Sequence, residues 1–317
     1  MRAITNTAPG RLELRELPLP TPGRGQARIR TRAAAVCATD LKMIAGWQRT
    51  GFPAIPGHEW CGTVDSLGPG ADPALLGRLC VGENILPGGG EVGFEHPGGY
   101  GEYFVTQAAN LYPLPDGFAP AQAALIEPLA VCVRGLSRLR PEPACRALVF
   151  GDGPLGLMML MLLRARGAEQ TALAGKQPFR LALAAELGAD PALEADNLPG
   201  SLAGQFPCIV EASGSPEALE WAFRLAPRMG RILVLGDYDQ ARAGFAWNDL
   251  LHREIELIGS NASAGAWPEA VRLAVSGGLP LARLVTRRFP PEQFAEAVEL
   301  AARGKNQCVK VIIDWDA

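Results

Sequence analysis

The stretch that decides the fold is A-L-V-F-G-D-G-P-L-G, residues 147–156. A short apolar run, Ala147–Phe150, leads into a G-x-G-x-x-G motif, and an apolar helical pattern follows from Leu157 to Leu163. This order predicts a buried strand, a tight turn and a helix start. Glycines at this spacing permit the turn, let a pyrophosphate approach the backbone and let the helix pack close to the strand. The helix N-terminus adds unpaired N–H groups and the positive end of the helix dipole.

The motif therefore predicts a dinucleotide-binding turn, although a turn that only packs a helix on a sheet would carry similar glycines. The residues expected to contact the nucleotide here are Gly151, Gly153, Pro154, Leu155 and Gly156.

Strand and helix patterns alternate after this turn. The predicted strands are Gln170–Ala174, Cys208–Glu211, Arg231–Leu235 and Glu256–Gly259, and the predicted helices between them are Phe179–Leu187 and Pro216–Leu225. Such alternation is typical of a doubly wound parallel sheet, an α/β fold of the Rossmann type, here assigned to residues 128–264. Ligands of such sheets bind at the carboxyl ends of the strands, which adds Gly236 to the candidate nucleotide contacts.

The end of the predicted strand Gln170–Ala174 bears on the choice of nucleotide. NAD-binding sheets usually place an Asp or Glu here, which accepts from the ribose hydroxyls. In this chain Gly175 follows the strand, and Lys176 and Arg180 add positive charge. The absence of an acid and the presence of these cations favour NADP over NAD. Alternatively, Arg180 is a solvent-facing helix residue paired with a nearby glutamate.

Composition limits the class of protein. The chain has 317 residues, 48% of them hydrophobic and 20% charged, which suits a globular protein with room for two domains. A net charge of -3 without a basic run argues against nucleic-acid binding. The N-terminus lacks the apolar segment of a signal peptide, and the longest apolar run, Leu155–Leu163, is too short to span a membrane. The seven dispersed cysteines, with no C-x-x-C, suit reduced thiols in the cytoplasm.

The two ends of the chain predict a second domain. The first third is rich in Pro, Gly and short strand patterns such as Ala27–Thr31, so we expect an irregular antiparallel β unit. The C-terminal segment combines two helix patterns with the strands Leu284–Phe289 and Val309–Ile313. We expect it to complete the first domain, which gives a discontinuous, mainly β domain of residues 1–127 and 265–317, with the active site in the cleft between the domains.

Three side chains in the first third suggest metal chemistry. Cys37, His58 and Glu59 are a thiolate, an imidazole and a carboxylate, the ligand types of an open catalytic zinc site. Their spacing alone is not diagnostic. A buried structural cysteine and a hydrogen-bonded histidine would look the same in the sequence.

Glu127 is a further candidate ligand. It lies within a predicted helical stretch, Ala119–Leu136, which we expect to be broken at Pro128. A carboxylate among Ala, Leu and Ile is costly to bury unless it is paired or bound to a metal. A helix cap or a buried salt bridge is the alternative role.

Taken together, these motifs resemble the zinc-containing medium-chain dehydrogenase/reductase family, which includes alcohol, polyol and threonine dehydrogenases. The motifs, in family order and at family-like spacing, are C-A-T-D at residues 37–40, G-H-E-x-x-G-x-V at 57–64, I-E-P-L-A at 126–130, the glycine turn at 151–156 and V-E-A-S-G at 210–214. The resemblance spans nearly the whole chain. It is specific for the fold, with a GroES-like first domain, and unspecific for the substrate.

The resemblance implies roles for the candidate residues. Cys37 and His58 would bind the zinc, and Glu127 would be the third ligand, with Glu59 replacing it or alternating with it. Asp40 would hold the second nitrogen of the ligand histidine. Thr39 would pass the substrate proton onward, and Lys42 would end this relay or contact a cofactor ribose. Ser213 lies where relatives cross under the cofactor.

One departure from the family pattern concerns a second metal. Many relatives carry a four-cysteine lobe with a structural zinc, but the corresponding stretch, Glu83–Tyr103, has no cysteine. We therefore expect one zinc per chain and a shortened, glycine-rich loop.

The expected activity is a zinc-dependent hydride transfer between an alcohol or carbonyl substrate and NAD(P). The alternatives are a zinc-free enoyl or quinone reductase of the same fold, and a dinucleotide-binding protein without turnover. Besides the small substrate, the expected partners are further copies of the chain in a dimer or tetramer. The resemblance implies this, because relatives usually associate through the nucleotide domain, around Trp247–Gly259 here. No nucleic-acid or membrane partner is expected.

Overall fold

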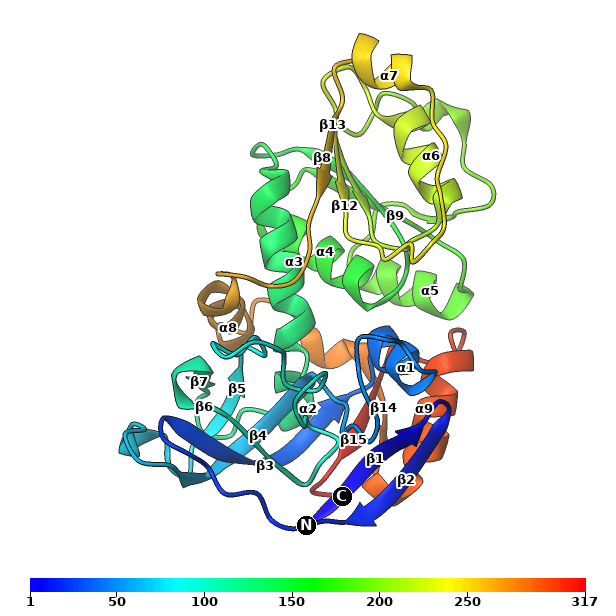
Figure 1. Ribbon diagram of the computed structural model, residues 1–317. Helices are drawn as coiled ribbons and strands as arrows, with labels where there is room; N and C mark the ends of the chain where they lie inside the picture. Colours follow the sequence, from blue (N-terminus) through cyan, green and yellow to red (C-terminus); the bar gives the residue numbers. More distant parts are fainter. The chain divides into compact units, whose positions relative to one another are not determined.

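The structure is a computed structural model that describes residues 1–317. The chain divides into two compact units. The first unit comprises Met1–Glu127, Trp267–Ser276 and Leu281–Ala317, and the second comprises Pro128–Ala266 with Gly277–Pro280. Figure 1 shows that both ends of the chain, blue and red, belong to the same unit.

The first unit is built mainly from β-strands. Its strands are β1 (Arg2–Ala8), β2 (Arg11–Glu16), β3 (Gln26–Ala35), β4 (Glu59–Leu67), β5 (Leu79–Gly82), β6 (Tyr103–Gln107), β7 (Leu111–Pro113), β14 (Val285–Phe289) and β15 (Lys310–Asp314). Its helices are α1 (Ala38–Ile44), α2 (Pro120–Ala123), α8 (Trp267–Val275) and α9 (Phe294–Arg303). β1 and β2 form a hairpin, and the other seven strands form one sheet in the order β14-β15-β3-β4-β5-β7, with β6 also paired to β3.

β3 is the central strand of this sheet and explains how the chain ends meet. It pairs with β4 along nearly its whole length, and β15 adds to its other edge, with Ile312 opposite Ala35. Alternate residues of β3 are buried, as expected for a strand with one face on the core. The C-terminal strand β15 therefore joins the sheet formed by the first third of the chain. All pairings in the sheet are antiparallel except β14 with β15.

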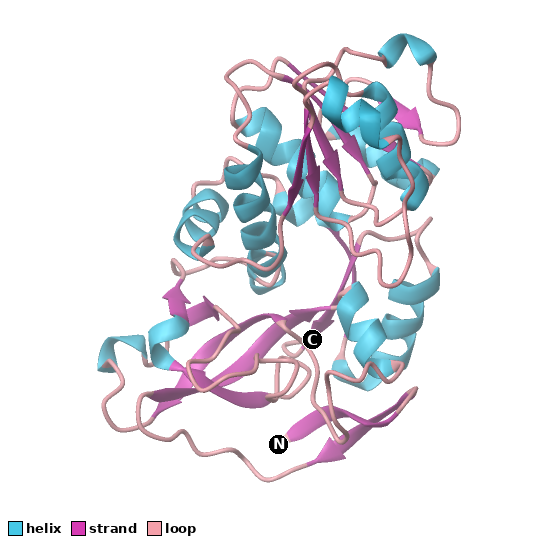
Figure 2. Cartoon of the chain, turned by 45° about the horizontal axis from the view of Figure 1, so that its top comes forward, coloured by secondary structure: helices cyan, strands magenta, loops and turns pink.

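The second unit is a parallel sheet with helices on both faces (Figure 2). Its strands are β8 (Arg146–Phe150), β9 (Gln170–Gly175), β10 (Ala192–Glu194), β11 (Cys208–Glu211), β12 (Arg231–Val234) and β13 (Glu256–Gly259). Its helices are α3 (Ile126–Leu139), α4 (Pro154–Ala165), α5 (Pro178–Glu186), α6 (Pro216–Leu225) and α7 (Trp247–His252). The first two residues of α3 belong to the first unit, and the rest of the helix, from Pro128, belongs to the second. The strand order, β10-β9-β8-β11-β12-β13, is doubly wound about β8, as predicted. Only the short edge strand β10 was not predicted.

The prediction of one helix broken at Pro128 was wrong. The break falls at Ala124 and Leu125, between α2 and α3, and Pro128 is the third residue of α3. The first N–H groups of a helix have no partner within the helix, so a proline in the first turn removes no helical hydrogen bond. None of the helices in the chain combines the length and the apolar character needed to cross a lipid bilayer.

Candidate metal and nucleotide sites

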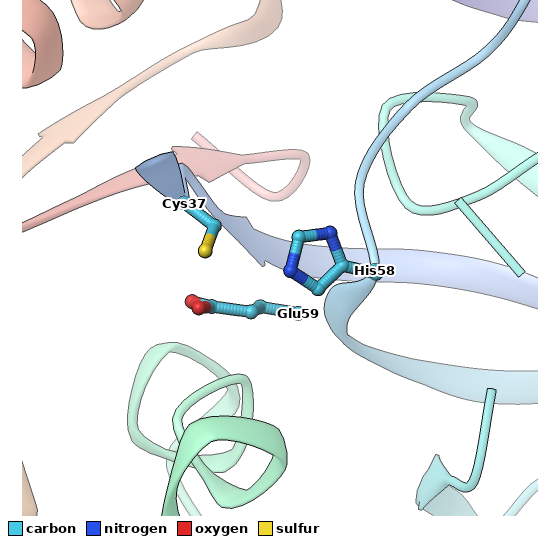
Figure 3. Close-up of side chains that lie close together, drawn as sticks. All are labelled: Cys37, His58 and Glu59. Atoms are coloured by element: carbon cyan, nitrogen blue, oxygen red, sulfur yellow. The ribbon is translucent and has the colours of Figure 1, made fainter. Parts of the chain in front are cut away.

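The ligand atoms of Cys37, His58 and Glu59 all lie within 4.8 Å of one another. Figure 3 shows the thiol, the imidazole and the carboxylate directed toward a common point. His58 and Glu59 are buried and Cys37 is half-buried. A soft thiolate, an imidazole and a carboxylate at this separation fit the donor set of a catalytic zinc ion.

Cys37 is held at the start of α1. It is the N-cap residue of this helix, and its backbone N–H donates to Asp40 Oδ2 at 2.9 Å. Its thiol donates to Thr39 Oγ1 at 3.7 Å. The helix start therefore fixes the thiol at the end of the preceding strand, with the Thr39 hydroxyl beside it.

His58 is fixed by contacts on both sides of its ring. Its Nδ1 lies 3.0 Å from Asp40 Oδ1, which leaves Nε2 as the atom for a metal. Asn84 Nδ2 donates to the carbonyl oxygen of His58 at 2.7 Å, and the Phe94 ring lies 4.8 Å from the imidazole. Burial disfavours charge on His58, but the neighbouring Asp40 and Cys37 outweigh burial and raise the pKa of His58 well above its usual value.

Gly57 provides the backbone conformation before His58. Its φ of +100° is one that L side chains rarely adopt, and a Cβ there would lie 2.5 Å from a ring carbon of Tyr100. Tyr100 in turn donates its hydroxyl to Asp40 Oδ2 at 3.3 Å. The glycine therefore allows the tyrosine to close over the carboxylate that orients the histidine.

Glu59 forms a buried ion pair that the sequence did not reveal. Lys310, the first residue of β15, places Nζ 2.5 Å from Glu59 Oε1, and both side chains are at most 3% exposed. Burial lowers the pKa of Lys310, but Glu59 outweighs it, so that the pKa is raised. The negative charge of Glu59 is thus compensated from a strand 251 residues away in the chain.

Glu127 is not part of the group formed by Cys37, His58 and Glu59. It is the second residue of α3 and is half-buried. Burial raises its pKa to about 7, an effect that His58 opposes and Glu59 reinforces. Its carboxyl group therefore interacts electrostatically with the cluster but lies outside the tight group of ligand atoms.

The remaining predicted residues of the first unit lie on α1. Asp40 is fully buried and contacts His58, as the resemblance implies, while Thr39 and Lys42 are half-buried. The residues that sequence reasoning missed are those that support the cluster from other elements: Asn84, Phe94, Tyr100 and Lys310. Their side chains carry no local pattern, so only the tertiary fold identifies them.

In the second unit, the glycine turn leads directly from β8 into α4. Gly151 has a φ of +111°, and a Cβ at Gly156 would lie 1.9 Å from the carbonyl oxygen of Gly151, so α4 starts in close contact with the turn. A Cβ at Gly153 would meet nothing within 4 Å. The turn is thus tightly packed against the protein at Gly156 and open at Gly153. Gly153 is the N-cap of the twelve-residue helix α4, which begins with Pro154 and Leu155. These features fit a bound pyrophosphate.

The turn after β9 differs from the expectation. Asp152 Oδ2 accepts from the backbone N–H groups of Lys176 and Gln177 at 2.8 and 2.7 Å. Arg180 is buried, with one guanidinium nitrogen 3.9 Å from Asp152 Oδ1, so it is not the solvent-facing residue considered as an alternative. Lys176 is exposed and pairs with Asp196 at 2.7 Å. The sequence showed Asp152 inside the glycine motif, but its partner segment became visible only in the fold.

Ser213 and Gly236 lie together at the carboxyl ends of β11 and β12. Buried Glu211 accepts from the Ser213 N–H at 2.7 Å and from the Gly214 N–H at 3.1 Å. A Cβ at Gly236 would lie 2.2 Å from the backbone nitrogen of Gly214. The two loops therefore pack backbone to backbone at Gly214 and Gly236, where a side chain would not fit.

Comparisons with known proteins agree with this architecture. Residues 23–116 match the family described as alcohol dehydrogenase GroES-like domain, and residues 154–276 match the family described as zinc-binding dehydrogenase. The first match covers Cys37, His58 and Glu59, and the second begins at Pro154 in the glycine turn.

Whole-chain relatives extend these matches. The D-altritol 5-dehydrogenase of Agrobacterium fabrum is 31% identical over 92% of this chain and 93% of its own length. Among solved structures, the short chain alcohol dehydrogenase RspB of Escherichia coli CFT073, complexed with NADH, has a TM-score of 0.93 at 24% identity and covers 99% of both chains. Galactitol-1-phosphate dehydrogenase of Escherichia coli has a TM-score of 0.90 at 24% identity, over 99% of this chain and 100% of that one. These structures share the fold, and with the sequence matches they place the chain in the zinc-type medium-chain dehydrogenase/reductase family, as an NAD(P)-dependent oxidoreductase.

Proposed function

We propose that this dehydrogenase holds one zinc ion at Cys37, His58 and a glutamate, and interconverts a small alcohol with its carbonyl compound. The observation that carries the proposal is the convergence of the Cys37, His58 and Glu59 ligand atoms within 4.8 Å. When bound, zinc supplies Lewis acidity to the substrate oxygen, and the nicotinamide accepts or returns the hydride. The chain's own contribution is to position these groups and to move the proton.

The glutamate that completes the metal site is proposed to be Glu59. It belongs to the compact group, whereas Glu127 lies outside it. Glu59 also pairs with Lys310, so ligation would share its carboxylate between the ion and the ammonium group. Glu127 remains the second candidate, because its carboxyl group lies close enough to the cluster for His58 and Glu59 to affect its pKa, which burial raises to about 7. Zinc content of Glu59→Gln and Glu127→Gln distinguishes the two.

The proton of the substrate hydroxyl is proposed to leave through Thr39. Its Oγ1 lies 3.7 Å from the Cys37 thiol, so the hydroxyl borders the proposed metal position. Lys42, three residues further along α1 and half-buried, is proposed as the end of this relay. Asp40 orients His58 and is a positioning residue.

In the second unit, we propose that Gly151, Gly153, Pro154, Leu155 and Gly156 bind the pyrophosphate and that Ser213 and Gly236 line the nucleotide site. The open volume at Gly153 supports this assignment. The preference for NADP that Gly175, Lys176 and Arg180 suggested stays a prediction. Lys176 is exposed but pairs with Asp196, and Arg180 is buried beside Asp152, so neither cation adds support to it.

The experiment that tests the function is a substrate panel on the purified protein. Polyols come first, because the 31% identical relative is named as an altritol dehydrogenase. Secondary alcohols, amino alcohols and the matching carbonyl compounds follow, each with NAD and NADP, and zinc is quantified on the same sample. We expect about one zinc per chain and alcohol-dependent nicotinamide reduction. Turnover of activated C=C bonds without zinc, or nucleotide binding without any turnover, would contradict the proposal.

A second copy of the chain is proposed as a partner along β13. This strand is the edge of the parallel sheet, where unpaired backbone groups favour strand addition. Trp247 and Leu251 beside it are 73% and 65% exposed, and Leu257 on it is also exposed. Such a cluster of large apolar side chains is typical of an association surface.

Leu257→Lys is expected to weaken this dimer at least tenfold, because a charge at the centre of an apolar interface costs roughly 1.4 kcal/mol or more. Light scattering after size-exclusion chromatography, over a dilution series, measures the change. Leu76→Lys replaces a leucine of the first unit that is also exposed, at 56% against 41% for Leu257, and should leave the mass unchanged. A monomeric parent protein would rule out the surface.

The functional domains are proposed to follow the predicted bounds, 1–127 with 265–317 and 128–264, and the cytoplasm is proposed as the compartment. All seven cysteines are free thiols, which suits a reducing environment.

A further inference from the structure

The carboxylate at the turn after β9 belongs to Asp152, a residue of the glycine turn. In parallel nucleotide-binding sheets the acid that accepts from the ribose hydroxyls stands at the end of this strand. Here β9 ends at Gly175, and a Cβ at that position would lie 2.5 Å from the Asp152 Cβ and 2.6 Å from its Oδ2. No side chain fits at position 175 because Asp152, from the glycine turn, already occupies that volume.

Asp152 is rigidly held in this position. It is 9% exposed, and its Oδ2 accepts two backbone hydrogen bonds, from Lys176 at 2.8 Å and Gln177 at 2.7 Å. Its Oδ1 lies 3.9 Å from a guanidinium nitrogen of Arg180, which is 8% exposed. One carboxylate thus engages the two N–H donors of the turn and the nearest buried cation.

We propose that Asp152 replaces the missing acid at the end of β9 and makes the enzyme select NAD over NADP. The inference rests on the proposed nucleotide site, and it reverses the preference drawn from the sequence. A fixed carboxylate can accept from a ribose 2′-hydroxyl, whereas it repels a 2′-phosphate. The two N–H groups of the turn could otherwise donate hydrogen bonds to a phosphate, but they already donate to Asp152.

The cations of the turn do not offset this repulsion. Arg180 is matched by Asp152 itself. Lys176 is half-exposed and shared between Asp196 at 2.7 Å and Glu217 at 3.9 Å, so its charge lies among carboxylates. With Asp152, three acids therefore border the turn against two cations.

Asp152→Asn tests the role, since it keeps an oxygen for the backbone donors and removes the charge. Binding is measured calorimetrically for NAD and NADP, and for adenosine 5′-diphosphate and adenosine 2′,5′-bisphosphate, which need no turnover. The parent should bind NAD at least about tenfold more tightly than NADP. In the variant, the ratio of the NADP to the NAD dissociation constant should fall at least about tenfold, mainly because NADP binds more tightly. Glu169→Gln, which removes an exposed acid at the opposite end of β9, should change the ratio less than about threefold.

A second variant covers the case in which Asp152→Asn fails to fold. Asp152→Gly with Gly175→Asp moves the carboxylate to the end of β9, where the glycine makes room for it, and should keep the preference for NAD. A parent that prefers NADP, or an Asp152→Asn variant that weakens both nucleotides equally, would overturn the inference, as would a protein that binds neither. Clear NAD selectivity without turnover of any alcohol would instead refute only the proposed function.

Discussion

Replacement of Cys37 by serine is expected to remove the zinc and to lower kcat/KM on the order of 10³-fold. A serine hydroxyl stays protonated near neutral pH and is a much poorer zinc ligand than a thiolate. Loss of Lewis acidity worth several kcal/mol corresponds to a change of this size. Zinc is quantified on the purified variant, and kcat/KM is measured with the best alcohol of the panel.

Nucleotide binding separates a metal defect from misfolding. Cys37 lies in the first unit, at the start of α1, whereas the glycine turn lies in the second. Cys37→Ser should therefore bind NAD as the parent does. Cys308→Ser is the matched control, because this buried thiol donates to the Gly304 carbonyl at 3.3 Å, a bond that a hydroxyl can replace. The metal assignment fails if Cys37→Ser retains stoichiometric zinc and the parent rate.

Replacement of Lys310 by methionine is expected to destabilise the zinc-free protein by about 3–5 kcal/mol. Lys310 and Glu59 form an ion pair with both side chains at most 3% exposed, so removing the ammonium leaves a buried carboxylate without its partner. The loss should appear as a lower midpoint of urea or thermal unfolding, followed by circular dichroism.

The double variant Glu59→Leu with Lys310→Met provides the decisive comparison. Both charges are then gone, and a buried ion pair replaced by hydrophobic side chains of similar volume often costs little, so stability should recover to within about 1 kcal/mol of the parent. Lys305→Met, at an exposed lysine two residues after the end of α9, should be neutral. If Lys310→Met alone were as stable as the parent, Lys310 would not compensate the charge of Glu59.

Sequence reasoning succeeded wherever the physics is local. The glycine turn, the strands of the parallel sheet other than β10, and the presence of α4, α5 and α6 follow from short-range patterns, and the structure has them. It failed at Pro128, where a helix break was predicted, because a proline in the first turn of a helix is compatible with it. It also missed β10, which is only three residues long and pairs at the edge of the sheet.

At the candidate metal site, too, the sequence predicted the residue types but not all of their contacts. The residue types at 37, 58 and 59 suggested a zinc site, but the sequence could not choose between Glu59 and Glu127. That choice depends on where the first residue of β4 and the second residue of α3 lie in space, and the compact group contains Glu59. His58 precedes the first residue of β4, so the alternation of side chains within a strand does not separate it from Glu59.

By itself, the sequence determined the fold class and the strand, turn and helix around the glycine motif, because these depend on short-range backbone patterns. It also supplied the residue types of the candidate metal site. Only the tertiary structure decided which charges meet. Lys310 reaches Glu59 through the pairing of β15 with β3, and Asp152 reaches the turn after β9 because β8 and β9 are neighbours in the sheet. The physical reason is that electrostatic contacts depend on distances in space, which sheet pairing sets between segments far apart in the chain.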